Sequence, residues 1–551
     1  MLCIGLAGMA ADKTKISIVM AEQSDPVVLL RHAEYFATKQ QRQQFVVETL
    51  QRQAETSQAD LLGFLEEMER IGLVEEVQPL WLVNAVCCYA EPAVVDALAQ
   101  RNDVSFVGIC QQEQWIFESD AVIDRHGDGR EIAANLMQVN APQVWTQGYT
   151  GQGVLVAIID TGINYDHADL AGRLWDGGDE YPHHGYDFSD NDNDPMDHHG
   201  HGTHVAGTVC GTGSSGTQTG IAPSATVMAL KAFNDQGEGD ETQWIAAMQF
   251  ALEHGADVIN MSLGRPQPNV AQKRMIRRAC DNTLAAGVVA SVCAGNIRQM
   301  QFMVPVPYNI YTPGDCPPPS LHEDQMVNAG GTSCVICVGA VDSNDNIASF
   351  SSEGPSQWAD VAEYADYPYT AGSATEIGLI RPDICAPGVQ IKSLDCNNPQ
   401  GYTLMDGTSM ATPLVTGAIA LMLSKNHDLT PAQIDQILES TAVKLTDHKS
   451  NDFGAGRLDA LAAVNAVDFN AISEGDPSQL SVYPNPSHGA FTVSCEGMQQ
   501  VEVFSVDGRL LQRMENVGET CQINGLADGV YLLQVTTLHG KSLHKVIIIS
   551  N

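Results

Sequence analysis

The hydrophobic pattern changes twice along the chain and divides it into three regions. Between residues 133 and 468, which we call the central region, apolar runs such as "GVLVAIID", "GADVINMSL" and "CVICVGAV" alternate with longer stretches of helical spacing. Continuous apolar strands that alternate with helices are typical of a parallel sheet covered on both faces. We therefore predict an α/β fold with a doubly wound parallel sheet for the central region.

The flanking regions have different patterns. Residues 13–115, the N-terminal region, begin with a Gln- and Glu-rich helical stretch and continue as a strand, an amphipathic helix and a strand. This order predicts a small α/β domain. Residues 479–551, the C-terminal region, are short alternating strands with a turn signal at Asp507 and Gly508, which predicts a small β-sandwich.

The connecting segments are polar. Residues 116–132 and 469–478 are predicted linkers, and the first of them is a suitable place for proteolytic cleavage. Residues 1–12 have a short apolar stretch that ends in small residues but lack a basic start. We interpret them as the remnant of a signal peptide.

Composition narrows the range of partners. The 551 residues include 28 Lys and Arg against 67 Asp and Glu, a net charge of −39, so phosphates would be repelled and nucleic acid is excluded as a partner. No run of about 20 apolar residues occurs after the first segment, so no membrane span is expected. Among the 14 cysteines, Cys495 and Cys521 could pair, but the sequence alone does not establish a disulfide.

Three motifs in the central region carry side chains suited to chemistry. Asp160 ends the apolar strand "GVLVAIID", at the sheet edge where open α/β sheets bind ligands. His201 lies between glycines in "DHHGHGTHVAG", and Ser409 precedes an apolar helix in "DGTSMATP". A serine at this helix N-terminus would have its own N–H directed at a developing oxyanion. Taken singly, the three have simpler explanations as a strand-end aspartate, one member of a histidine cluster and a helix cap.

Together, in the order Asp, His, Ser and with these flanks, the motifs resemble the subtilisin family of serine peptidases. The resemblance covers the central region. It implies that Asp160 orients His201, that His201 accepts a proton, and that Ser409 attacks the peptide carbonyl to form an acyl-enzyme. It also makes Asn296, which ends "SVCAGN", the side chain that donates to the oxyanion.

The resemblance further implies a groove for an extended peptide. The segments "NDQGEG" and "NMSLG" are similar to the two backbone segments that pair with substrate in this family. Their predicted substrate-binding residues are Gly237, Glu238, Gly239, Ser262, Leu263 and Gly264. The sequence after Asn296, "IRQMQFM", departs from the family pattern, so the side-chain preference at the cut is left open.

An acidic loop, "YDFSDNDNDPMDHHG", raises the question of calcium. Alternating carboxylates and amides suit this cation, but the spacing does not match an EF-hand, and a solvated acidic loop is the simpler interpretation. The candidate ligands are Asp187, Asp190, Asp192, Asp194 and Asp197. The implied chemistry requires no cofactor, so calcium would be structural only.

Both flanking regions also resemble known modules. The N-terminal region, through "WLVNAV" and the strands around it, is similar to the inhibitory propeptides of subtilisin-like enzymes, with an unrelated domain as the alternative. A propeptide would make the chain a zymogen, inhibited by its own N-terminal region and cut within 116–132, with Arg125 and Arg130 as candidate positions. The C-terminal region, with "YPNPSHGAFTV" and "GVYLLQVTT", resembles the sorting domain of the type IX secretion system.

These resemblances imply a secreted serine endopeptidase that acts on proteins or peptides. The type IX machinery would export it through the periplasm and outer membrane of a Gram-negative bacterium to the cell surface or the medium. A rival interpretation is a catalytically silent surface protein that binds peptides on the same scaffold. The presence of Asp160, His201, Asn296 and Ser409 together favours the enzyme. The same His201 and Asn296 argue against the related serine-carboxyl peptidases, which use Glu and Asp at these places.

Overall fold

The computed structural model describes residues 12–33, 35–36, 38–117, 122–124, 131–321, 331–358, 360–361, 378–467, 481–483, 490–495, 498–505, 510–515, 517–526, 529–537 and 540–548. The chain forms two compact units, one with residues up to Leu30 and Thr38–Val467, the other with Arg31–Ala37 and Asp468–Asn551. Most of the predicted signal-peptide remnant, Arg125, Arg130, the 507–508 turn and the second linker lie outside the described residues. The domain bounds stay a prediction.

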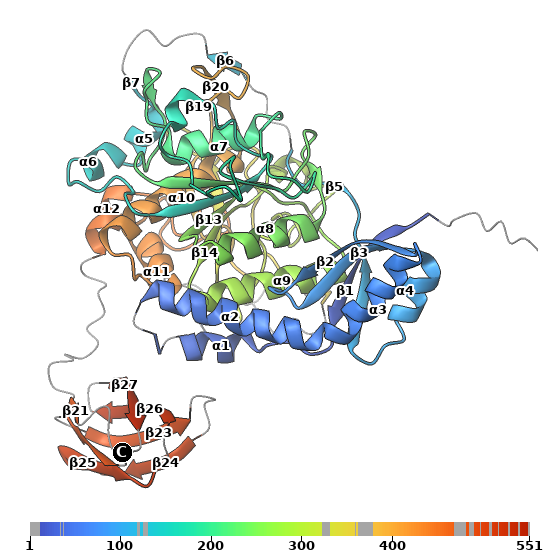
Figure 1. The fold of residues 1–551 in the computed structure, drawn as a ribbon. Coiled ribbons are helices and arrows are strands. Elements are labelled where there is room, and N and C mark those ends of the chain that lie inside the picture. Colours follow the sequence, from blue (N-terminus) through green and yellow to red (C-terminus); the bar gives the residue numbers. More distant parts are fainter. Residues whose placement is uncertain are drawn as a thin grey trace, which may run out of the picture. The chain divides into compact units, whose positions relative to one another are not determined.

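The first unit is built around a seven-stranded sheet whose strand pairs are all parallel (Figure 1). In spatial order its strands are β18 (Ile384–Pro387), β17 (Val335–Val341), β14 (Val289–Cys293), β13 (Val258–Met261), β8 (Leu155–Asp160), β11 (Thr226–Lys231) and β9 (Gly185–Asp187). The predicted parallel sheet is therefore confirmed. The chain adds strands on one side of β8 and then on the other, so β8 lies where the order reverses, the usual place for a ligand site.

Helices cover both faces of this sheet. One core joins alternate strand residues, such as Val156 and Ile158 of β8, to the buried residues of α7 (His201–Cys210) and α10 (Thr408–Lys425). Helices α8 (Glu241–Glu253) and α9 (Val270–Ala285), whose residues lie outside this core, contact each other, and α8 also contacts β8 and β11. Successive side chains of a strand point to opposite faces, so the second helix pair packs on the other face.

Shorter elements complete the central region. They are α5 (Ala134–Gln138), α6 (Ala141–Trp145), α11 (Pro431–Thr441), α12 (Ala460–Ala466), β6 (Val122–Asp124), β7 (Glu131–Ile132), β10 (Thr217–Gln218), β12 (Glu238–Gly239), β15 (Ser320–Leu321), β16 (Gly331–Thr332), β19 (Ile391–Leu394), β20 (Tyr402–Met405) and the 3₁₀ turns Ala168–Leu170 and Arg298–Met300. Within the part of the chain that the structure describes, no helix is long and apolar enough to cross a bilayer.

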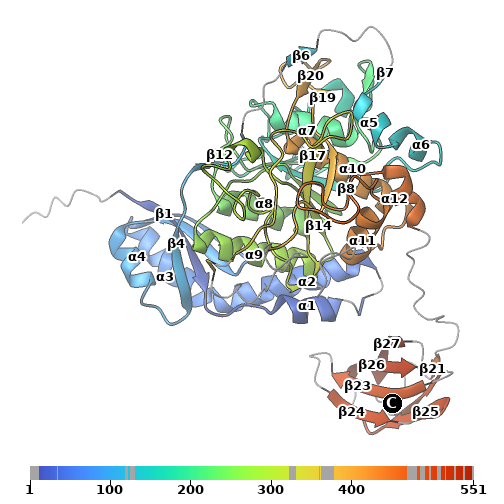
Figure 2. The same cartoon turned by 180° about the vertical axis from the view of Figure 1, so that it is seen from behind.

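The N-terminal region contains an antiparallel sheet, which confirms the predicted α/β character. Its strands follow the order β2 (Val74–Leu80), β3 (Ala85–Ala90), β1 (Thr14–Met20) and β4 (Val104–Ile109), with helices α3 (Ala59–Arg70) and α4 (Pro92–Leu98). Between β1 and α3 the chain inserts α1 (Pro26–Ala33) and the long α2 (Lys39–Ser57), and after β4 it forms the short β5 (Glu113–Gln114). Seen from behind, α2 runs beside α9 (Figure 2).

The C-terminal region consists of two antiparallel sheets, as predicted. One contains β21 (Ser481–Tyr483), β22 (Ala490–Ser494) and β25 (Thr520–Asn524); the other contains β24 (Leu510–Glu515), β23 (Met498–Ser505), β26 (Gly529–Thr537) and β27 (Gly540–Ile548). Alternate apolar residues of both sheets, such as Phe491 and Val503, share one core. Cys521 pairs in register with Val493, and among the described residues no disulfide joins it to Cys495.

Candidate active site

Asp160 and His201 meet at the carboxyl end of β8. Asp160 is the last residue of that strand and His201 is the first residue of α7; both are buried. The His201 Nδ1 lies 2.7 Å from the Asp160 Oδ1. A Cβ on Gly202 would lie only 2.0 Å from the Gly162 carbonyl oxygen and 3.1 Å from the Asp160 Cβ. A glycine is therefore needed for α7 to approach β8 closely enough to form this contact.

The protonation of His201 follows from these surroundings. Burial of the imidazole opposes its positive charge, but the attraction and hydrogen bond of Asp160 prevail, with a smaller contribution from Asp197, so the pKa of His201 is raised. Because Nδ1 faces the carboxylate, the free basic position of the ring is Nε2. A histidine held this way can accept a proton from a neighbouring hydroxyl.

Asp197 holds the turn that carries His201. Its Oδ1 accepts hydrogen bonds from the Thr161 hydroxyl (3.0 Å) and from the amides of His199 (3.0 Å) and Gly200 (2.8 Å). Its Oδ2 accepts from the Thr203 amide (2.9 Å) and hydroxyl (2.6 Å). Through these five bonds Asp197 connects Thr161, which follows Asp160 in the chain, to the turn before α7 and to the first turn of that helix. The sequence pattern around Asp197 suggested only a calcium ligand and gave no sign of this positioning role.

The predicted calcium ligands do not converge on one point. Besides Asp197, the Asp187 Oδ1 accepts from the amides of Ser189 and Asp190, and Tyr165 donates its hydroxyl to Asp194. Burial raises the pKa of Asp187 to about 6. Among the described residues, no three His, Cys, Asp or Glu side chains gather in a way that would hold a metal ion. Calcium binding by this loop stays a prediction, and we derive no role for a metal from it.

Ser409 is the second residue of α10, and the turn before it depends on glycine. Gly407 has φ 155° and ψ 157°, a conformation that is essentially restricted to glycine. The Ser409 hydroxyl donates to the Ser262 carbonyl (3.3 Å), and the Ser262 hydroxyl donates to the Ser409 carbonyl (2.8 Å). No hydrogen bond between Ser409 and His201 occurs among the described residues. Catalytic hydrogen bonds are commonly long or misaligned in unliganded sites, so this geometry is compatible with proton transfer.

Asn296 lies beside this turn with its side chain already oriented. Its Oδ1 accepts hydrogen bonds from both the amide and the hydroxyl of Thr408, each at 2.9 Å. The Thr408 hydroxyl in turn accepts from the Gly295 amide (3.1 Å). A Cβ on Gly407 would lie 3.4 Å from the Asn296 Nδ2. Because the carboxamide oxygen is engaged, its NH₂ group is presented toward the start of α10. Thr408 therefore positions Asn296, a role that its place at a helix start does not reveal in the sequence.

The two predicted groove segments lie on either side of a piece of the chain itself. Residues Glu113–Phe117, which we call the tail segment, run between them. Strand β5 pairs antiparallel with β12, matching Gln114 with Glu238 and Glu113 with Gly239. The Ile116 amide donates to the Gly237 carbonyl (3.1 Å), and on the other side the Gly264 amide donates to the Trp115 carbonyl (3.1 Å). The groove is therefore filled by an extended peptide.

Side chains of the tail segment also enter the groove. Trp115 is fully buried, 5.6 Å from Trp244 in an edge-to-face arrangement, with the Arg265 guanidinium 5.9 Å from its ring. The Phe117 ring lies 5.3 Å from that of Tyr311. Leu263, from the second groove segment, is buried and its carbonyl accepts a hydrogen bond from the Cys293 thiol (3.2 Å). Aromatic side chains therefore contribute apolar contacts to the backbone pairing.

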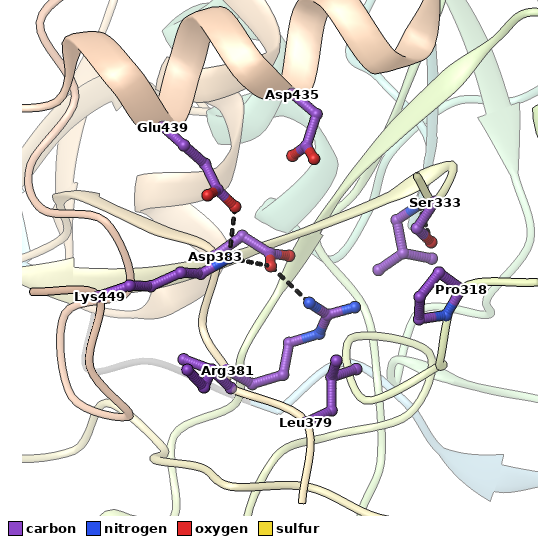
Figure 3. Close-up of a pocket in the computed structure, with 10 residues that line it drawn as sticks. Pro318, Ser333, Leu379, Arg381, Asp383, Asp435, Glu439 and Lys449 are labelled. Atoms are coloured by element: carbon purple, nitrogen blue, oxygen red, sulfur yellow. Dashed lines mark hydrogen bonds and ion pairs between the residues drawn. The ribbon is translucent and has the colours of Figure 1, made fainter. Parts of the chain in front are cut away.

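A second cluster of charged residues lies in the central region and includes none of the residues above. Figure 3 shows Arg381 and Lys449 directed at Asp383. These residues line a cavity of about 10 Å³. Lys449 also pairs with Glu439. Burial, and then the charges of Glu439 and Asp383, raise the pKa of Asp435 well above its usual range. The cluster thus has three carboxyl groups and two cations, so one carboxyl group, that of Asp435, is most stable when it is neutral. We interpret the cluster as a structural network.

Comparisons with known proteins agree with this architecture. Residues 151–456 match the model of the subtilase family, and residues 481–549 match that of a secretion system C-terminal sorting domain. The sorting domain indicates export through the outer membrane of a Gram-negative bacterium, as predicted.

Individual relatives cover different parts of the chain. Subtilisin E of Bacillus subtilis is 33% identical over 383 residues, which are 69% of this chain and 81% of that protein. Subtilisin DY of Bacillus licheniformis is 35% identical over 328 residues, 59% of this chain and 96% of that protein. Bacillopeptidase F of Bacillus subtilis is 30% identical over 84% of this chain, but the chain spans only 31% of its length. With the parallel sheet and with Asp160, His201 and Ser409 placed around its carboxyl edge, the chain belongs to the subtilase family.

Proposed function

We propose that the protein is a secreted serine endopeptidase that is made as a zymogen. One observation carries this proposal: the groove beside Ser409 already holds an extended polypeptide, paired with Gly237 on one side and Gly264 on the other. Pairing through the backbone accepts many sequences, which suits an enzyme that acts on proteins. Such an enzyme also requires a base, and the His201 imidazole, which is oriented by its hydrogen bond with Asp160, can act as one.

The residues of the site divide the chemistry in the following way. The Ser409 Oγ attacks the carbonyl carbon of the bound peptide, and its proton passes to the His201 Nε2. Asp160 stabilises the resulting imidazolium, while the Asn296 NH₂ and the Ser409 amide donate to the oxyanion. Collapse breaks the C–N bond, and the amine leaves with the proton from His201. Water then attacks the Ser409 ester with His201 again as base, which releases the acid and restores the hydroxyl.

The register of the tail segment supports a specific maturation site. The Gly264 amide donates to the Trp115 carbonyl, and we infer that the tail segment runs antiparallel to residues 262–264. Two residues further along that register, Phe117 lies opposite Ser262, whose carbonyl accepts a hydrogen bond from the Ser409 hydroxyl. The bond delivered to Ser409 is then Phe117–Glu118, which lies ahead of Arg125 and Arg130. The Tyr311 ring beside Phe117 is suited to a large apolar side chain at this position.

A fluorophosphonate probe tests this function. The wild-type chain and its Ser409→Ala variant are incubated, and both the label and the new N-termini are located by mass spectrometry. We expect Ser409 to be labelled and the chain to be cut after Phe117, with both events lost in the variant. Failure of Ser409 to react, even after the N-terminal region has been digested with trypsin and its fragments separated from the central region, would overturn the proposed peptidase activity and favour the silent peptide-binding protein.

A further inference from the structure

Helix α2 binds the central sheet at the edge opposite to the active site. Leu155 begins β8 and Asp160 ends it, a distance of about 17 Å along the strand. Asp257, directly before β13, accepts a hydrogen bond from the Leu155 amide (2.9 Å) and therefore marks the amino edge of the sheet. Lys39, the first residue of α2, places its ammonium group 3.3 Å from the Asp257 Oδ1 and also donates to the Asp257 carbonyl. The Lys39 side chain is only 1% exposed.

The first turns of α2 are held by further polar contacts. Asp428 accepts from the Lys39 amide with its Oδ1 (2.8 Å), and its carbonyl accepts from the Arg42 guanidinium (3.1 Å). The Gln43 side-chain amide donates to the carbonyls of Leu252 (3.2 Å) and Ala256 (3.1 Å). In each of these bonds α2 provides the donor and the central region the acceptor. The helix therefore fits a set of acceptors that includes two carboxylates.

The N-terminal region thus contacts the central sheet at both edges. At the carboxyl edge the tail segment fills the groove, and at the amino edge α2 is anchored; in Figure 1 the helix lies along the side of the sheet away from α7. A cut after Phe117 would remove the covalent link but neither of these contacts. Two linked contacts hold far better than one, because each keeps the other at high effective concentration.

We propose that Asp257 and Asp428 form a second docking site for the N-terminal region, which keeps the cleaved region bound as an inhibitor after maturation. This proposal rests on the proposed zymogen function. Lys39 provides most of the specificity of this docking, because its buried ammonium group is stable only next to the Asp257 carboxylate. When α2 leaves, Asp257 retains the His427 Nε2 at 3.1 Å and the Leu155 amide, so the emptied site does not contain a bare buried charge.

Retention of the cleaved region can be measured without any activity of the enzyme. The Ser409→Ala chain is nicked with trypsin in the 116–132 linker, the cut at Arg125 or Arg130 is verified by mass spectrometry, and dissociation of the N-terminal fragment is followed by size-exclusion chromatography. Lys39→Met removes the ammonium, and Asp428→Ala removes the acceptor for the first turn of α2. Lys13→Met is the matched control, because Lys13 pairs with Glu75 inside the N-terminal region.

We expect the parent and the Lys13→Met chain to retain the fragment. Lys39→Met should release it about 100-fold faster, as expected when one partner of a buried ion pair is removed, and Asp428→Ala should act in the same direction with a smaller effect. Equal retention in all four chains would overturn the docking site. Because Ser409 is absent from every chain, that result would leave the proposed peptidase activity untouched, whereas a failure of probe labelling would leave the docking result standing.

Discussion

The close approach of α7 to β8 makes a strong prediction for Gly202→Ala. The added methyl group would lie 2.0 Å from the Gly162 carbonyl oxygen, whereas real Cβ contacts stay above 3.0 Å, so the start of α7 must move by about 1 Å. His201 is the adjacent residue, and its 2.7 Å contact with Asp160 would lengthen beyond the range of a good hydrogen bond.

The expected loss of activity follows from that displacement. A misplacement of about 1 Å costs about 100-fold in rate, and complete loss of the correct imidazole orientation costs about 10⁴-fold. We therefore expect kcat/KM of Gly202→Ala to fall by between about 10² and 10⁴. The thermal midpoint should fall by only a few degrees, because the methyl group can be accommodated by a local shift.

The assay is the hydrolysis of a short peptide p-nitroanilide after the N-terminal region has been digested with trypsin and both its fragments and the trypsin have been separated from the central region. Gly178→Ala provides the matched control: Gly178 has φ 64° in an exposed turn, and its Cβ would meet nothing within 4 Å. This control carries backbone strain but should keep its kcat/KM. A Gly202→Ala enzyme with the activity of the control would show that the contact between α7 and β8 does not set the position of His201.

Three further changes test separate parts of the structure. Asn296→Ala should lower kcat by about 10²–10³ with little change in KM, the range known for loss of an oxyanion-hole amide in a subtilisin; a normal kcat in steady-state assays would exclude the amide from the oxyanion hole. Asp160→Asn should lower kcat/KM by about 10⁴ and move the acid limb of its pH profile to lower pH, because the carboxylate raises the pKa of His201; an unmoved limb would contradict this. The raised pKa of Asp435 means that the folded chain keeps a proton that the unfolded chain loses above about pH 4, so stability falls as pH rises past that value. Asp435→Asn should therefore raise the melting temperature at pH 7 but not at pH 3.5, measured calorimetrically on the inactive Ser409→Ala chain.

The central sheet could be predicted because its strands are buried on both faces. A run such as "GVLVAIID" must then be apolar at nearly every position, and it stands out among helices. Asp160 could be placed at an edge of the sheet for the same reason, since it ends such a run. His201 and Ser409 were identified because the order of the three motifs resembles that of the subtilisin family, and not from any local pattern around each residue.

The positioning contacts could not be predicted, since they join distant residues of ordinary type. Thr408 reaches Asn296 across 112 positions, and a threonine at a helix start resembles any cap. Strand β5 has two residues, too few to show alternation, and its partner β12 is equally short. Lys39 lies in a polar stretch that suggests a solvated helix, and its burial arises only when the central region supplies Asp257.

The pairing of the tail segment on both of its sides has a consequence for which proteins the enzyme can cut. About five residues must become fully extended to enter the groove, so a helix or an internal strand of a target must first open. Local opening costs almost nothing at a frayed loop but several kcal/mol in a packed element. At about 1.4 kcal/mol per factor of ten, an element that costs 5 kcal/mol to open is cut several thousand times more slowly than a loop of the same sequence. We therefore expect the rate at which a protein is cut to depend on the local stability of its own fold, with damaged or unfolded chains cut fastest.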